Sequence, residues 1–213
     1  TVTGRPLLLF DPDEMRTLEV PWVHRVEPAA TVDRPRGYVL LPGWPEVEAR
    51  LGAHGLRVER LTHPVAAEVD VFRVDGLELA DRPYQGRVRV EAEVETVPEQ
   101  RELPPGALFV PADQPRFEVA VQLLEPGAPD SLFAWGFFAG VTERKEYIGP
   151  ALLERLAAEM LGDPEVAAAW REALKDPRLA ADPAARYLWW YRHTPFSDET
   201  VGLLPVFRVR HGL

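Results

Sequence analysis

Prolines limit the length of the regular elements that this chain can form. The 213 residues include 22 prolines, about twice the usual share of ~5%, and they fall between apolar segments rather than inside them. A proline interrupts a helix or strand because it lacks a backbone N–H and has a fixed φ. With no internal repeat, low-complexity tract or long heptad pattern in view, the sequence predicts a folded chain of short elements.

The N-terminal third of the chain is expected to contain strands around one helix. Leu7–Phe10, Leu18–Val23 and Gly37–Leu41 are short apolar runs, and a helix is expected from Pro45 to a glycine cap at Gly55. The segment 56–61 then alternates, so residues 36–61 predict a strand-helix-strand unit. Further on, residues 87–97 alternate apolar and charged side chains, which favours an antiparallel sheet packed on one side only.

Three Asp-Pro pairs in the last third of the chain indicate where helices begin. Asp163, Asp176 and Asp182 each precede a proline, which places an N-cap acid before a residue suited to the first helical position. Apolar stripes at helical spacing cover residues 150–161 and 165–174, and a third helix is expected over 184–193.

The expected fold class is therefore α+β. An N-terminal strand-helix-strand unit and an antiparallel sheet are followed by a C-terminal helical part packed on the sheet. We expect residues 1–213 to form a single domain, with a β-rich subregion at 1–124 and a helical subregion at 130–195.

Composition narrows the classes of partner. The net charge of −10 repels phosphate backbones and anionic lipid headgroups, so neither nucleic acid nor a membrane is an expected partner. The absence of cysteine excludes thiolate metal sites and leaves the compartment open. Because the chain begins at Thr1, we expect a piece excised from a longer polypeptide; a trimmed recombinant product is the alternative.

The segment from Glu125 to Tyr147 gathers large aromatic side chains beside polar ones. Asp130 and Ser131 are interpreted as a helix cap or as an acid and a hydroxyl at a site, and Trp135 as core or as the wall of a ligand groove. The charged run that ends in Glu146 and Tyr147 is a solvated helix face or a substrate contact.

A helical projection of residues 184–193 separates two groups of side chains. Tyr187, Trp190 and Tyr191 share the side expected to face the core. Arg186, Trp189 and His193 lie opposite and are the candidates for a partner surface, because Trp and Arg are enriched in interface anchors.

His24 and Glu27 have the His-x-x-Glu spacing of some zinc ligands. They lie in an extended-looking stretch, where residues three apart point to opposite faces, and no third ligand is evident. We therefore assign no metal ligand and no catalytic residue in this chain, and a stand-alone zinc hydrolase is kept only as an alternative.

Several long strings give the chain a family resemblance. LEVPWVHRVEP, LPPGALFVPADQP and DPAARYLWWYRHTPFSDE, with the segments between them, resemble the region that follows the catalytic domain in bacterial zinc carboxypeptidase-like proteins. The resemblance implies a non-catalytic C-terminal accessory domain, with a structural or substrate-access role beside a metallopeptidase domain of the same polypeptide. It also implies that the zinc and its ligands belong to the catalytic domain of the parent protein, where peptide bonds are hydrolysed. The alternative is a peptide- or glycan-binding module with an aromatic groove.

Overall fold

A computed structural model describes residues 1–28, 30–144 and 147–213. The chain divides into two compact units, Thr1–Asp33 and Arg34–Leu213. The first unit has no helix or strand among its described residues, and its apolar side chains are exposed, so the strands predicted at Leu7–Phe10 and Leu18–Val23 are wrong. An apolar run becomes a strand only where a neighbouring strand takes up its backbone hydrogen bonds, and none is paired with these runs.

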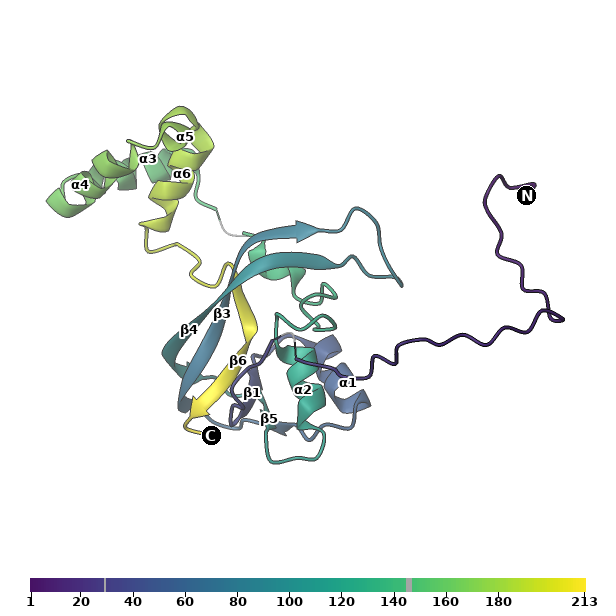
Figure 1. Ribbon diagram of the computed structural model, residues 1–213. Coiled ribbons are helices and arrows are strands. Elements are labelled where there is room, and N and C mark those ends of the chain that lie inside the picture. Colours follow the sequence, from purple (N-terminus) through teal and green to yellow (C-terminus); the bar gives the residue numbers. More distant parts are fainter. Residues whose placement is uncertain (29, 145–146) are drawn as a thin grey trace. The chain divides into compact units, whose positions relative to one another are not determined.

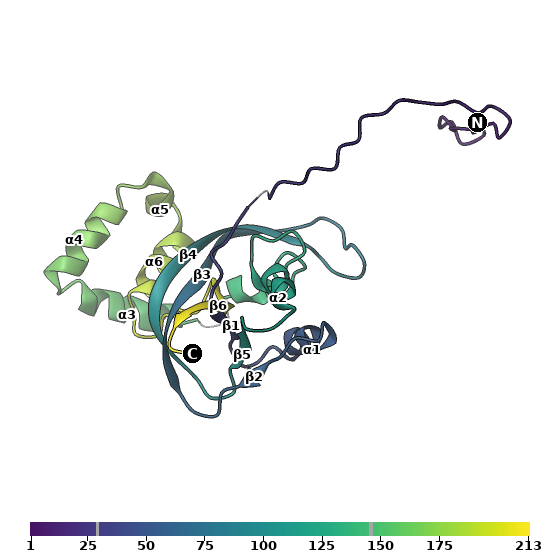
Figure 2. The same ribbon diagram turned by 60° about the horizontal axis from the view of Figure 1, so that its bottom comes forward.

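The second unit contains one antiparallel sheet of six strands, shown in Figures 1 and 2. Their order is β2-β5-β1-β6-β3-β4. The bounds are β1 Gly37–Leu40, β2 Glu59–Arg60, β3 Val65–Leu79, β4 Val90–Leu103, β5 Leu108–Pro111 and β6 Leu203–His211. The predicted α+β class is confirmed, and so is the strand-helix-strand order of residues 36–61, with helix α1 at Pro45–Ala53 between β1 and β2.

One face of the sheet is covered by helices α1 and α2, the latter at Phe117–Leu124. This face buries Tyr38, Leu40, Phe72, Val110, Leu204 and Val206 against Val47, Leu51 and Phe117. The predicted alternation of the strand at 87–97 is also present, because Val90, Ala92 and Val94 belong to this cluster. Helix α2 was not predicted from the sequence and lies in the stretch expected to be β-rich.

The opposite face of the sheet is buried as well, so the prediction of a sheet packed on one side is wrong. Its apolar cluster consists mainly of strand residues, among them Val39, Val69, Val71, Phe109, Phe207 and Val209. The long hairpin β3–β4 bends as it crosses the other strands (Figure 2), and its pairing with β6 shifts register twice. Because a bulged, strongly twisted sheet curls, its strands cover one another's apolar side chains without a second layer of helices.

The helical part follows a short 3-10 turn, η1 at Ala139–Thr142, and precedes β6. It contains α3 Pro150–Met160, α4 Pro164–Ala173, α5 Pro177–Ala181 and α6 Pro183–Arg192. All three predicted helix starts are confirmed, since the carboxylates of Asp163, Asp176 and Asp182 each accept a backbone N–H at 2.8 Å. No described helix has the length and apolar content needed to cross a membrane.

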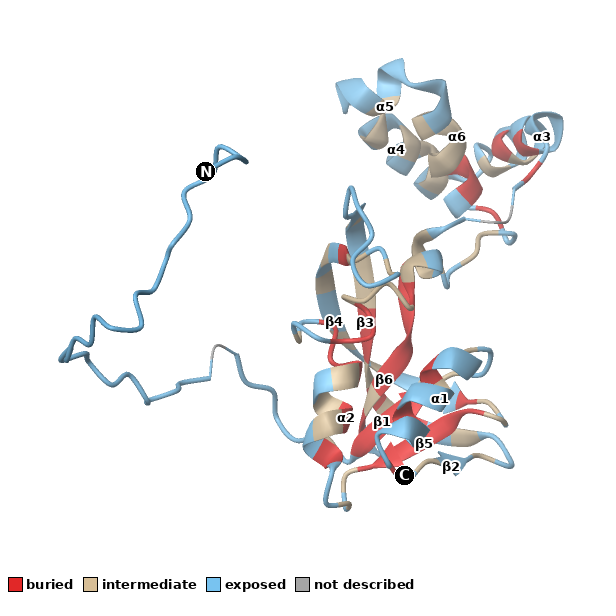
Figure 3. Cartoon of the chain, turned by 90° about the vertical axis from the view of Figure 1, so that its right-hand side faces the viewer, coloured by how far each residue is buried: buried red, intermediate tan, exposed pale blue. Residues whose placement is uncertain are grey.

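The helices have an apolar cluster of their own. Ile148, Leu153, Ala157, Trp190 and Tyr191 are its buried members, and they are separate from the two clusters of the sheet. Figure 3 shows the same division, with most buried residues in the strands and a smaller group in α3 and α6. The predicted C-terminal helical part is therefore present, and its helices pack on one another around a cluster of their own.

Candidate functional site

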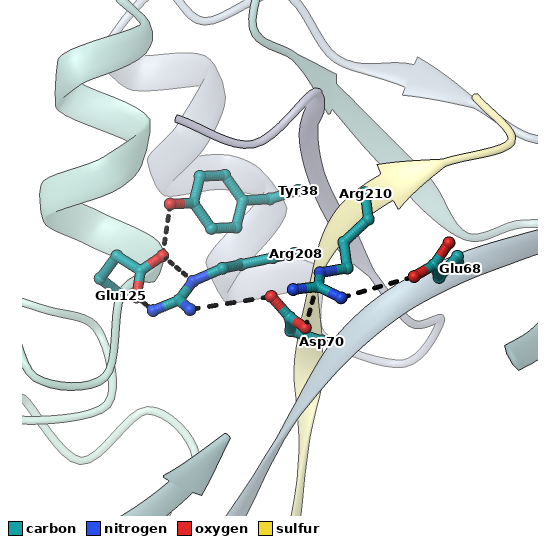
Figure 4. A network of polar contacts seen from close by, with 6 residues as sticks. All are labelled: Tyr38, Glu68, Asp70, Glu125, Arg208 and Arg210. Atoms are coloured by element: carbon teal, nitrogen blue, oxygen red, sulfur yellow. Dashed lines mark hydrogen bonds and ion pairs between the residues drawn. The ribbon is translucent and has the colours of Figure 1, made fainter. Parts of the chain in front are cut away.

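A buried group of polar side chains joins four elements of the sheet unit (Figure 4). Tyr38 of β1 donates a hydrogen bond of 2.5 Å to Glu125, which ends α2. Arg208 of β6 donates two more to the same carboxylate, at 2.6 and 2.5 Å. The side chains of Arg208 and Glu125 are only 18% and 7% exposed. Such a bidentate, charge-assisted pair has a fixed geometry and holds the end of α2 on the middle strands.

The network continues outward to β3. Asp70 lies 3.9 Å from Arg208 and 3.1 Å from Arg210, and Arg210 also reaches Glu68 at 3.4 Å. Burial disfavours the charged form of Arg208, but the hydrogen bonds and charge of Glu125, followed by Tyr38 and Asp70, outweigh this and raise its pKa. Every buried side-chain nitrogen or oxygen among the described residues has a hydrogen-bond partner. The network is thus internally satisfied, which is typical of a structural centre.

The Tyr38 hydroxyl makes the network sensitive to alkaline pH. Burial, together with the charge of Glu125 and the hydrogen bond to it, raises the pKa of Tyr38 well above its ordinary value. The folded chain therefore keeps this proton at a pH where the unfolded chain has lost it. The contribution of the Tyr38 hydroxyl to the free energy of unfolding is fully present below about pH 10. Above that pH it should fall by roughly 1.4 kcal/mol per pH unit. Urea unfolding at a series of pH values should show this slope in the natural chain and a shallower one in Tyr38→Phe; equal slopes would contradict the assignment.

Asp130, Ser131 and Trp135 lie in the turns that follow α2. The buried Ser131 hydroxyl accepts the backbone N–H of Ala134 at 3.0 Å and donates to the carbonyl of Pro126 at 3.2 Å. This is the bonding of a cap, as one interpretation predicted, although turns rather than an α-helix follow it. The Asp130 carboxylate accepts the indole N–H of Trp135 at 3.3 Å.

The same turns hold the tip of the β3–β4 hairpin. The guanidinium of Arg89 lies 4.8 Å from the centre of the Trp135 ring and donates to the carbonyl of Pro129 at 2.7 Å. Arg87 lies 3.6 Å from the centre of the Phe137 ring and pairs with Glu46. Through these cation–π contacts, the rings of Trp135 and Phe137 pack against the hairpin. Tyr84, at the tip, is 56% exposed, and its ring centre lies 6.0 Å from that of Trp135.

Helix α6 presents aromatic side chains on more than one side. Of the three side chains that the helical projection placed on the core side, Trp190 and Tyr191 are buried and Tyr187 is half-buried. Trp189 stacks on His193 with ring centres 3.9 Å apart, and its other neighbours are Trp170 of α4 and Trp190. Arg186, which the projection placed beside Trp189 and His193, lines a hollow together with Tyr187 and Trp190.

This helical hollow has a volume of about 440 Å³ and lies among α3, α4 and α6. Its apolar lining includes Leu153, Ala157, Leu161, Trp170, Tyr187 and Trp190, and its charged members are Glu154 and Arg186. Glu154 was not among the predicted site residues, and Trp170 was predicted only as part of an apolar helix face. Helical spacing can identify the apolar face of a single helix, but it does not show that faces of α3, α4 and α6 meet around one hollow.

The remaining candidates lie apart from this hollow. Tyr147 is 83% exposed and lines a smaller hollow of about 390 Å³ with Phe196, while Glu146 lies outside the described residues. His24 and Glu27 are exposed in the first unit, where Glu27 pairs with Arg25 at 3.3 Å and the His24 Nδ1 lies 3.5 Å from the Trp22 carbonyl. Within residues 1–28, 30–144 and 147–213, no three His, Asp or Glu side chains are grouped to hold a metal ion.

Comparisons with known proteins show a partial similarity. No protein-family model and no solved structure matches the chain. Carboxypeptidase 2 of Trichophyton rubrum is 31% identical over 110 residues, which are 52% of this chain and 20% of that protein. Carboxypeptidase 2 of Trichophyton tonsurans is 30% identical over 106 residues, again 20% of its length. The chain thus spans about a fifth of these fungal relatives, and half of it is similar to a region of a carboxypeptidase.

Proposed function

We propose that the chain is a non-catalytic region of a carboxypeptidase-like protein. The observation that carries this proposal is the unequal coverage of the match, which takes in 52% of this chain but only 20% of the T. rubrum carboxypeptidase 2. Most of the length of the relative therefore lies outside the region that this chain matches. The internally satisfied network around Glu125 and Arg208 supports a structural role, because its buried polar groups bond to one another and join separate elements of the sheet unit.

The proposed partner is an adjacent peptidase domain of the same polypeptide, which would hold the catalytic zinc and its ligands. In that arrangement the present chain supports the peptidase domain or shapes the access of peptide substrates to it. The resemblance noted above was to bacterial proteins, whereas the relatives named here are fungal.

Metal analysis and a peptidase assay of the isolated 213-residue chain test this proposal. We expect no stoichiometric zinc after dialysis against a zinc-containing buffer, and no release of C-terminal residues from a mixture of peptides. Release that is abolished by a chelator, and by His24→Ala but not by His63→Ala, would make the chain a complete hydrolase and overturn the proposal. The two histidines are a matched pair because both lie in loops outside the helices and strands.

A second candidate function is favoured by one contact. The exposed ring of Tyr84 lies beside Trp135, and paired aromatic faces of this kind accept peptides or sugar rings. A saturable change in tryptophan fluorescence on titration with a peptide or an oligosaccharide, lost in Trp135→Phe, would favour a binding module over a purely structural region.

A further inference from the structure

The helical hollow is formed by two regular helix faces. Positions 153, 154, 157 and 161 of α3 and its C-terminal end, and positions 183, 186, 187 and 190 of α6, recur every three or four residues and line one cavity. Trp170 of α4 also lines it. Its volume of about 440 Å³ lies within the ~300–1,000 Å³ of small-molecule sites, which have mostly apolar walls and a few polar groups.

The aromatic walls of the hollow are held in place by contacts behind them. Trp170 is flanked by Trp189 and Trp190, with ring centres 4.8 and 4.9 Å away. The Tyr187 hydroxyl donates to the Ile148 carbonyl at 2.6 Å and accepts its backbone N–H at 2.9 Å. With its hydroxyl engaged in this way, Tyr187 contributes its ring to the wall. Walls that are ordered before a ligand arrives lower the entropic cost of binding.

Two opposite charges complete the lining. Glu154 comes from α3 and Arg186 from α6, and both line the hollow. Neither side chain forms a hydrogen bond or ion pair with another residue that the structure describes, although the backbone N–H of Arg186 donates to the Asp182 carbonyl within the helix. Elsewhere in the helical part, Arg155 pairs with Glu159, and Lys175 with Glu172. The hollow therefore offers one anion and one cation on facing helices, around an apolar interior.

We propose that the helical hollow binds a free L-amino acid with a large apolar side chain. The ligand carboxylate lies against Arg186, the ammonium group against Glu154, and the side chain against Trp170 and Trp190. A zwitterion satisfies both charges, whereas either end of a longer peptide brings only one and a simple anion is repelled by Glu154. This ligand class goes beyond the proposed function and does not rest on it.

Tryptophan fluorescence of the 213-residue chain gives a direct test, because two indoles line the hollow. Titration with L-phenylalanine, excited where phenylalanine does not absorb, should give a saturable change at millimolar concentrations or below. N-acetyl-L-phenylalanine lacks the ammonium group and L-phenylalaninamide lacks the carboxylate. Each should bind about tenfold more weakly or worse, since each loses one charge-assisted contact.

Variants of the two charged lining residues show which one binds the ligand carboxylate and which one binds the ammonium group. Arg186→Gln should bind phenylalanine and its amide equally, and Glu154→Gln should bind phenylalanine and its N-acetyl derivative equally. Arg192→Gln is the matched control, because Arg192 is on the same helix, exposed and outside the hollow. It should bind like the natural chain.

Three results would overturn the proposal: no saturable change with phenylalanine, equal binding of all three compounds by the natural chain, or folded Arg186→Gln and Glu154→Gln variants with unchanged preferences. The first two need no variant, so a variant that fails to fold does not remove the test. Since neither zinc content nor peptide hydrolysis enters this experiment, its failure is distinguishable from that of the proposed function.

Discussion

Replacing Arg208 by methionine is expected to lower the free energy of unfolding by about 3–5 kcal/mol, the cost of leaving one charge of a buried pair without its partner. Glu125 then loses both guanidinium hydrogen bonds and keeps only the Tyr38 hydroxyl. The carboxylate side chain is 7% exposed, so water cannot replace the lost bonds without local opening. Urea unfolding followed by circular dichroism at neutral pH measures the loss.

Two further variants separate this effect from a general loss of charge. Lys175→Met breaks a pair in which both side chains are 72% exposed, and it should cost no more than about 0.5 kcal/mol. The double variant Arg208→Met with Glu125→Leu should cost clearly less than the sum of its single variants, because the second change removes the stranded carboxylate. Additive costs in this cycle would show that the pair is not coupled.

Truncating Phe207 to alanine is the second change with a large expected effect, a loss of about 3–5 kcal/mol. Phe207 is 2% exposed and belongs to the cluster on the helix-free face of the sheet, which is the face opposite α1 and α2. Its neighbours there include Val39, Val69 and Val71, which come from strands on both sides of β6. Removing the ring leaves a cavity that several strands share, and their paired backbones limit how far they can close it.

The matched control is Phe196→Ala. Phe196 is 56% exposed and lies in the turn between α6 and β6, so its truncation should change the free energy of unfolding by no more than about 0.5 kcal/mol. Comparable losses at the two positions would mean that the helix-free face contributes little to the stability of the sheet. The urea midpoint of each variant decides the comparison.

Much of the secondary structure could be predicted because its causes are local. An aspartate before a proline supplies both the acceptor and the fixed φ of a helix start within two positions, and all three such pairs begin helices. The strand at 87–97 was recognisable for the same reason, although its observed bounds are Val90–Leu103. A period of two or of 3.6 residues can be detected along the sequence alone.

The candidate sites were less accessible from the sequence. The buried side of α6 followed from helical spacing, yet the presence of Arg186 and Glu154 in the lining of one hollow depends on how α3 and α6 meet. Tyr38, Glu125 and Arg208 were not recognised, because they are far apart in the sequence and each is unremarkable in its own segment. Only the pairing of β1 with β6 and the end of α2 brings them together.

The sequence by itself determined the α+β class, the helix starts, and the strand-helix-strand order of residues 36–61, since propensity and capping act over a few neighbouring residues. Only the tertiary structure decided that the apolar runs at 7–10 and 18–23 are not strands and that β6, unpredicted, lies between β1 and β3. It also decided that both faces of the sheet are buried. Strand pairing depends on partners that are distant in the chain, and these partners cannot be identified from the residues of one strand alone.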